Sequence, residues 1–124
     1  MNPFIRVAIV AITIALITNC KKEGTFEKIL KEQTFNTIAV DDSKKTEEQK
    51  KETYTKSLQI LEPLLDSHKY TDPLDVSKKE EIQYRASLLS AALAIRLNDP
   101  SRSLGYYIGA FIVHPDRAMQ DLTG

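Results

Sequence analysis

The sequence predicts an all-α protein, and two observations lead to this prediction. Apolar residues recur at helical spacing in three segments beyond residue 43, and helix start and stop signals bound these segments. With 124 residues, 42% of them apolar, the chain has room for one small domain. We therefore expect a small antiparallel helical bundle over residues 43–124, preceded by a signal segment and a polar tether.

The first predicted helix of this domain spans residues 44–65. Its apolar residues recur at steps of four, three and four, as on a helix packed on one side: Tyr54, Leu58, Leu61 and Leu65. Pro63 lies opposite this stripe, and because it has no amide hydrogen it should kink the helix or mark its last turns. The turn-forming residues of segment 66–75 then predict a loop.

The second predicted helix spans residues 78–98 and is apolar on two sides. Ser77 and Glu80 have the spacing of a capping box, which predicts the start of the helix. One stripe consists of Ile82, Ala86, Leu89, Leu93 and Leu97, and the other of Tyr84, Leu88, Ala91 and Ile95. Because the two stripes lie on nearly opposite faces, we expect neighbouring helices to enclose this helix from both sides.

The third predicted helix spans residues 100–113, with Asp99 as its cap and Pro100 as its first residue. Its main apolar stripe is Leu104, Tyr107, Ile108 and Phe111, and Gly105 and Gly109 are expected to allow close backbone packing inside the bundle. Three further residues face away from this stripe and predict a contact with the C-terminal tail or with a partner: Tyr106, Ala110 and Val113. Tyr106 is the one we expect to be most exposed.

The N-terminus has the features of a targeting segment. Arg6 precedes an uncharged apolar run over residues 7–17, which has the length of the hydrophobic region of a signal peptide. A membrane-spanning helix needs about 20 apolar residues, so this run is too short to span a bilayer. The small residues that an ordinary signal peptidase site requires are missing.

The run ends in Ile17-Thr18-Asn19-Cys20, which resembles the lipobox of bacterial lipoproteins, in the relaxed form found in spirochaetes. The resemblance implies that residues 1–19 are a signal peptide cleaved between Asn19 and Cys20. It further implies diacylglycerol and acyl chains on Cys20, which would hold the domain stably on a bilayer. Lys21 stands where an Asp would signal retention at the inner membrane, so the outer membrane of a bacterial envelope is favoured.

Residues 20–42 are predicted to be a polar tether with weak structure. Phe26, Ile29 and Leu30 could form one apolar face of a short helix that begins at Thr25. The charged run at residues 41–51 is interpreted as the solvated start of the next helix and not as a binding patch.

Segment 84–117 resembles a degenerate tetratricopeptide repeat, a helical hairpin of about 34 residues. The matching positions are Ala91, Asn98 with Asp99, Ser103, Tyr107, Ala110 and Pro115. A faint internal echo relates residues 56–65 to residues 102–111, at a spacing of about 46 residues instead of the usual 34. The resemblance implies stacked helical hairpins, and an unrelated three-helix bundle remains the alternative.

Charge and motifs disfavour several functional classes. The 17 basic and 17 acidic residues cancel, so nothing indicates a nucleic-acid partner. No phosphate-binding loop, nucleophile elbow or zinc-ligand spacing is present, so we expect neither catalytic residues nor a metal site. The remaining polar cluster, interpreted as turn and cap residues, is His68 with Asp66, Asp72 and Asp75.

Together these features predict a lipid-anchored envelope lipoprotein whose helical domain is a protein-binding or scaffold module and not an enzyme. Its expected partners are the membrane, through the anchor, and either another protein or a second copy of the chain. No cofactor is expected beyond the lipid on Cys20. A surface-displayed factor that engages host molecules is the alternative, and an enzyme is the third candidate.

Overall fold

The computed structural model describes residues 22–123, and this part of the chain is all-α, as predicted. It contains the helices α2 (Thr25–Asp41), α3 (Glu47–Leu61), α4 (Pro73–Val76), α5 (Lys79–Arg96), α6 (Pro100–Val113) and α7 (Pro115–Thr123). The predicted signal segment and the predicted lipidation site, Asn19 and Cys20, lie outside the described residues.

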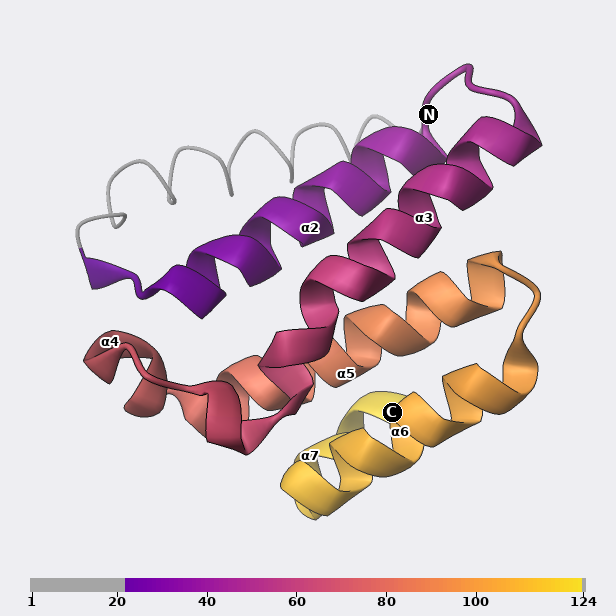
Figure 1. Cartoon of the computed structure of the whole chain (residues 1–124). Coiled ribbons are helices and arrows are strands. Elements are labelled where there is room, and N and C mark those ends of the chain that lie inside the picture. The colour runs from indigo at the N-terminus through magenta and orange to yellow at the C-terminus, as the bar shows by residue number, and fades with distance from the viewer. Residues whose placement is uncertain (1–21, 124) are drawn as a thin grey trace.

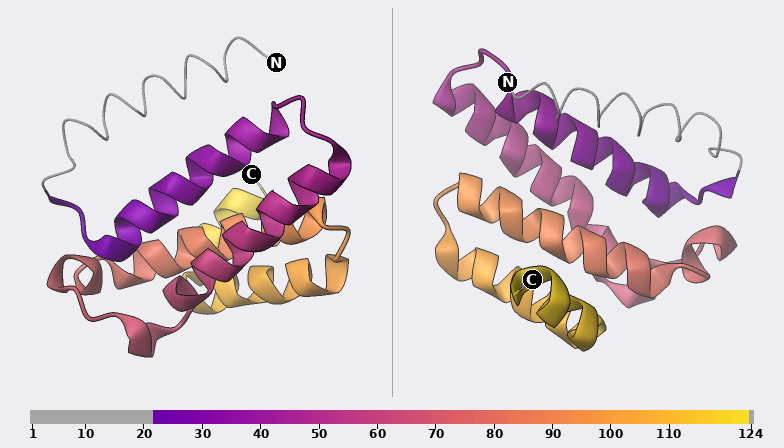
Figure 2. Two further views of the ribbon diagram at one scale, coloured as in Figure 1. Left: turned by 45° about the horizontal axis from the view of Figure 1, so that its top comes forward. Right: turned by 180° about the vertical axis from the view of Figure 1, so that it is seen from behind.

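The helices form two antiparallel hairpins, α2 with α3 and α5 with α6 (Figure 1). Helix α5 lies in the middle, where it packs on α6 on one side and on α2 and α3 on the other. Helix α7 turns back at the end of α6 and lies on the far side from α2 and α3 (Figure 2). The arrangement places α5 in contact with both hairpins.

Two apolar clusters fill the interior, and α5 contributes to both. The first joins α2, α3 and α5 and includes Leu30, Leu58, Leu61, Ile82 and Leu93. The second joins α5, α6 and α7 through Tyr84, Ala110 and Ala118, which are all fully buried. The prediction that this helix is enclosed from both sides is thereby confirmed, with Ile95 as an exception because its side chain is 53% exposed.

Helix α2 corrects the prediction of a weakly structured tether over residues 20–42. Thr25–Asp41 form a continuous helix that buries Leu30 and Val40 against α3 and α5. Its buried face also carries polar residues: the Gln33 side-chain oxygen accepts a hydrogen bond from the Ser57 hydroxyl of α3, at 2.8 Å. Because these buried polar groups are paired, the helix can pack with few apolar residues.

The N-terminus of α2 is held by aspartates from a distant loop. Asp75 is only 1% exposed, and its carboxylate accepts hydrogen bonds from the amides of Phe26 (2.8 Å) and Glu27 (3.1 Å). The neighbouring Asp72 accepts from the amide of Thr25 at 3.1 Å. Gly24 is required beside them, because a Cβ atom there would lie 2.2 Å from a carboxylate oxygen of Asp75.

The helix boundaries confirm some local signals and correct one. Asp99 caps α6, whose first residue is Pro100, and its carboxylate accepts from the amide of Arg102 at 3.2 Å. Pro63 falls in a 3-10 turn, Glu62–Leu65, so it ends α3. The predicted capping box at Ser77 is wrong, because the Ser77 hydroxyl donates to the Leu74 carbonyl and thereby closes α4 instead.

A polar cluster around Asp41 ties the other end of α2 to α3 and α5. The Asp41 carboxylate accepts from the Tyr54 hydroxyl of α3, and from Nε and Nη2 of Arg96 of α5 at 2.8 and 2.6 Å. Burial acts to raise the pKa of Asp41, but hydrogen bonds from Arg96 and Tyr54 lower it overall. Burial and the contact with Asp41 raise the pKa of Tyr54 to about 12. The cluster is therefore an ion pair with a neutral phenol at neutral pH.

We predict that Asp75→Ala lowers the free energy of unfolding by about 2 kcal/mol, because two amides of the first turn of α2 lose their acceptor. Hydrogen exchange should speed up first at Phe26 and Glu27. The matched control is Asp66→Ala, which removes the cap of a short 3-10 turn and should cost about 0.5 kcal/mol. Equal losses in the two variants would show that α2 does not depend on this contact.

We also predict that Asp41 contributes to stability only above acidic pH. Because its pKa is lowered on folding, its contribution is complete at pH 7 and is lost as the pH falls below about 4. Asp41→Asn should lower the free energy of unfolding by about 1 kcal/mol at pH 7, a value that allows for the partial exposure of the pair. Denaturant unfolding between pH 2 and pH 7 measures the difference, which should shrink in acid.

The charge-matched control for this measurement is Glu52→Gln, since Glu52 makes an exposed ion pair with Lys56 one helical turn away. Its effect should be small at every pH. A loss in Asp41→Asn that did not change with pH would contradict the assignment.

Candidate functional site

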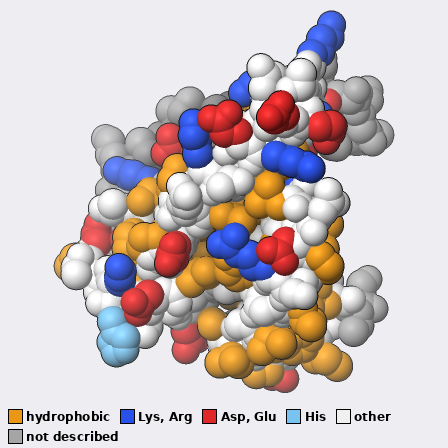
Figure 3. Space-filling view, turned by 45° about the vertical axis from the view of Figure 1, so that its right-hand side comes forward, with side chains coloured by type: hydrophobic (Ala, Val, Ile, Leu, Met, Phe, Trp, Pro, Cys, Tyr) orange, Lys and Arg blue, Asp and Glu red, His pale blue; other side chains and the backbone are white. Residues whose placement is uncertain are grey.

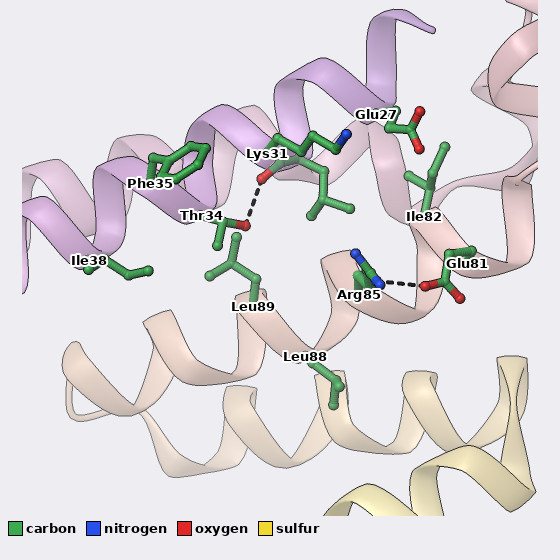
Figure 4. Close-up of a pocket in the computed structure, with 11 residues that line it drawn as sticks. Glu27, Lys31, Thr34, Phe35, Ile38, Glu81, Ile82, Arg85, Leu88 and Leu89 are labelled. Atoms are coloured by element: carbon green, nitrogen blue, oxygen red, sulfur yellow. Dashed lines mark hydrogen bonds and ion pairs between the residues drawn. The ribbon is translucent and has the colours of Figure 1, made fainter. Parts of the chain in front are cut away.

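A groove of about 360 Å³ runs between α2 and α5 (Figure 4). Its lining is mainly apolar, whereas three other hollows are lined mostly by polar and charged side chains. The lining residues are Glu27, Leu30, Lys31, Thr34, Phe35 and Ile38 from α2, and Glu81, Ile82, Arg85, Leu88 and Leu89 from α5. An apolar hollow between two helices is a common place for a ligand segment to bind.

The floor of the groove is part of the first apolar cluster, the one that joins α2, α3 and α5. Leu30 and Ile82 belong to that cluster and are buried, while Phe35 and Ile38 are half-buried and border the groove from α2. Figure 4 shows Leu89 directed from α5 toward α2, and Leu88 directed toward the opposite side. The helical spacing of α2 explains the arrangement, since Lys31, Thr34, Phe35 and Ile38 form a stripe beside its buried face.

Charged residues stand at one end of the groove, and they are paired within the chain. Glu27 accepts from Lys78 at 3.2 Å, and Lys31 is paired with Glu23. Across the groove, Glu81 accepts from Arg85 at 2.6 Å. The groove therefore presents apolar surface along its length and a compensated set of charges at its end.

Glu81 also joins the groove to α7. Its carboxylate accepts from Arg117, whose guanidinium lies 4.6 Å from the centre of the Tyr84 ring. Burial acts to raise the pKa of Glu81, but Arg117 and Arg85 lower it overall. A carboxylate that stays ionised beside two guanidinium groups has no proton to donate near neutral pH, so Glu81 is a poor general acid. Its ion pairs instead hold α5 and α7 together.

The structure buries one of the three predicted contact residues of α6 completely and the other two in part. Ala110 is fully buried against Tyr84 and Ala118, and Val113 packs on the same cluster. Tyr106 is half-buried against the first cluster, and its hydroxyl accepts from Nε of Arg102 at 3.1 Å. Ala110 thus shares a buried cluster with Ala118 of the C-terminal helix and has no exposed surface in this structure.

The predicted main stripe of α6 is largely on the outside instead. Leu104 is 60% exposed and Ile108 is 51% exposed, whereas Ser103 is buried and donates from its hydroxyl to the Ala91 carbonyl of α5 at 2.9 Å. Close approach of α5 and α6 requires small residues between them, so the bulky residues turn outward. Gly105 is not packed as expected, since a Cβ atom there would have no neighbour within 4 Å.

The aspartates of segment 66–75 act as caps, in agreement with the sequence interpretation. Asp66 accepts from the amide of His68, and Asp72 and Asp75 cap α2. Within residues 22–123 no three His, Cys, Asp or Glu side chains come together as a metal-ligand group. None of the helices in this same part combines the length and apolar character that a membrane span requires.

The groove was not predictable from the expectation of a weakly structured tether over residues 20–42, because α2 forms one of its walls. The available signal was helical spacing along this segment. Thr34 follows Leu30 by four residues, and Ile38 follows Phe35 by three. No protein-family model, curated protein or solved structure matches this chain.

Proposed function

We propose that this protein is a lipid-anchored lipoprotein of a bacterial envelope that binds a short amphipathic helix of another envelope protein in the groove between α2 and α5. The apolar lining of this groove, with its charges already paired, is the observation that carries the proposal. Such a groove buries the apolar face of a helix without requiring a charged partner.

The dimensions of the groove limit the size of the bound segment. Its α2 side extends from Glu27 to Ile38, which at 1.5 Å per residue is about 16 Å. This length matches about three turns of a partner helix, with apolar anchors at positions i, i+3 or i+4 and i+7. Phe35, Ile38 and Leu89 are the side chains on which those anchors would pack.

The stacking of the two hairpins supports a repeat-like scaffold. Their first helices, α2 and α5, share the groove, as the helices of stacked repeats share a concave binding surface. Ser57 and Ser103, which correspond in the internal echo, are both buried on the second helix of a hairpin. Each donates a hydrogen bond to the first helix of its own hairpin, through Gln33 and Ala91 respectively.

The proposed anchor at Cys20 would bring the groove close to the membrane. Because α2 begins at Thr25, only the four residues 21–24 separate it from Cys20, so the Cα atoms of Cys20 and Thr25 can lie at most about 17 Å apart. A partner segment that reaches the groove would therefore belong to a protein at the same membrane. This closeness favours an envelope scaffold, which holds one partner at the membrane surface.

We predict that a photo-crosslinking amino acid at Ile38 forms an adduct with an envelope protein in living cells of the source bacterium. The control position is Ile60 on α3, which is 44% exposed and lies outside the groove. Phe35→Asp in the same chain should reduce the adduct at least tenfold, because it puts a charge on the apolar wall. An adduct that is equally strong at Ile60, or unaffected by Phe35→Asp, would argue against the groove.

The lipid anchor is tested separately. Labelled palmitate should enter the wild-type protein and not Cys20→Ser, and Cys20→Ser should leave the membrane fraction after cell lysis, because acyl chains supply the membrane affinity. Equal labelling of the two proteins would rule out Cys20 as the site of lipidation.

A further inference from the structure

The outer face of α6 is an apolar surface that no segment of residues 22–123 covers. Leu104, Ile108 and Ile112 follow one another at steps of four, and they are 60%, 51% and 76% exposed. Figure 3 shows the corresponding region, where hydrophobic side chains gather in the lower part of the view over the second hairpin. Met119 and Leu122 of α7 are exposed apolar residues on the adjoining helix.

We propose that this α6 face is a self-association surface, on which α6 of a second copy of the chain packs in the antiparallel direction. The residues of the surface are Leu104, Gly105, Ile108 and Ile112. A contiguous apolar patch on an outer helix face is typical of an interaction site.

The charge pattern of α6 sets this face apart from the other outer surfaces. From Ser103 to Val113 the helix contains no Asp, Glu, Lys or Arg. The exposed face of α3, in contrast, carries Lys51, Glu52 and Lys56, as expected of a helix face in water. The occupant of the α6 face must therefore be apolar and uncharged itself, and a second α6 has these properties.

Gly105 supplies a second reason for close contact with another helix. It lies in the interior of α6 and destabilises the helix relative to Ala, yet no atom of the described chain outside its own helix would be within 4 Å of a Cβ atom there. Its neighbours one and two turns further on are Ile108 and Ile112, so it lies within the apolar surface. A missing side chain at this point lets the backbone of a second helix approach closely.

The surface is complementary to itself. In an antiparallel pair centred on Ile108, Leu104 faces Ile112 of the second copy and Ile108 faces its own equivalent, which is the symmetry of a closed dimer. Arg102 does not disturb this contact, because its guanidinium lies over the Tyr106 ring and donates to the Tyr106 hydroxyl on another side of α6. The paired faces therefore carry no charge.

A lipid bilayer fits the same surface less well. Helices that lie in the membrane interface are usually rich in Lys and Arg on their polar face. Helix α6 has Arg102 alone, and α7 pairs Arg117 with the acidic residues Glu81 and Asp121. We therefore infer a second copy as the occupant and treat binding to lipid as an outcome of the test.

Disulfide cross-linking of the full chain tests the arrangement, in a Cys20→Ser background that removes the native thiol. Ile108→Cys should cross-link to its equivalent under mild oxidation, because the two-fold axis places the Cα atoms within disulfide reach. Leu104→Cys and Ile112→Cys should cross-link poorly alone, since equivalent residues lie about two helical turns apart, but well when mixed. Ile60→Cys is the control for non-specific association.

Two outcomes of this experiment would overturn the proposal. Cross-linking at Ile60→Cys as efficient as at Ile108→Cys would show non-specific aggregation. Efficient cross-linking of Leu104→Cys to itself, without the mixed product, would show that the helices are not antiparallel about Ile108.

Sedimentation of the same full chain measures the affinity. Ile108→Glu should raise the dissociation constant of the dimer about 100-fold, because two carboxylates meet at the axis. At a concentration low enough for both proteins to be monomeric, their melting temperatures should be equal, because Ile108 is half-exposed. A wild-type chain that stays monomeric at about 100 µM would overturn the proposal. So would a monomer that binds phosphatidylcholine vesicles and loses this binding in Ile108→Glu, which would assign the face to the membrane.

Discussion

The burial of α5 on two sides is the constraint on which the other helices depend. Many of its buried residues are small. Ala86, Ala91 and Ala94 have no exposed surface, and Ser87 and Ser90 are buried as well. Small side chains let α6 approach α5 closely on one face, while Ile82 and Leu93 fill the cluster shared with α2 and α3 on the other. The groove and the outward face of α6 both follow from this packing, because the first borders α5 and the second is the side of α6 that α5 does not use.

The sequence was sufficient for the elements whose signals are local. The two apolar stripes of α5 and the Asp99-Pro100 start of α6 predicted those helices to within two residues of the observed ends. The direction in which α6 faces was not predictable by the same means. Hydrophobic spacing marks Leu104 and Ile108 as core residues, whereas the interior position is decided by how closely the α5 backbone approaches Ser103 and Ala110. That distance belongs to the pair of helices and is absent from either segment alone.

Helix α2 was missed for a related reason. Its buried face contains as many polar residues as apolar ones, and Gln33 becomes acceptable in the core only through Ser57, 24 residues further along the chain. Its first turn is capped by Asp75, which lies 49 residues after Phe26. Local propensity describes neither contact, because both are formed by segments that meet only after the hairpins stack. The candidate groove could not be predicted without them.

The two proposed surfaces lie on opposite sides of α5 and can be occupied together. Helix α2, which borders the groove, lies on one side of α5, and α6 lies on the other (Figure 1). An antiparallel α6 dimer would therefore leave both grooves open. A partner that presents two segments could occupy both grooves of one dimer. It would then bind the dimer more tightly than it binds a single groove, because the second binding step becomes intramolecular. Attachment of both chains to one membrane would favour the dimer further by confining them to a surface, so anchoring, dimerisation and groove binding would support one another.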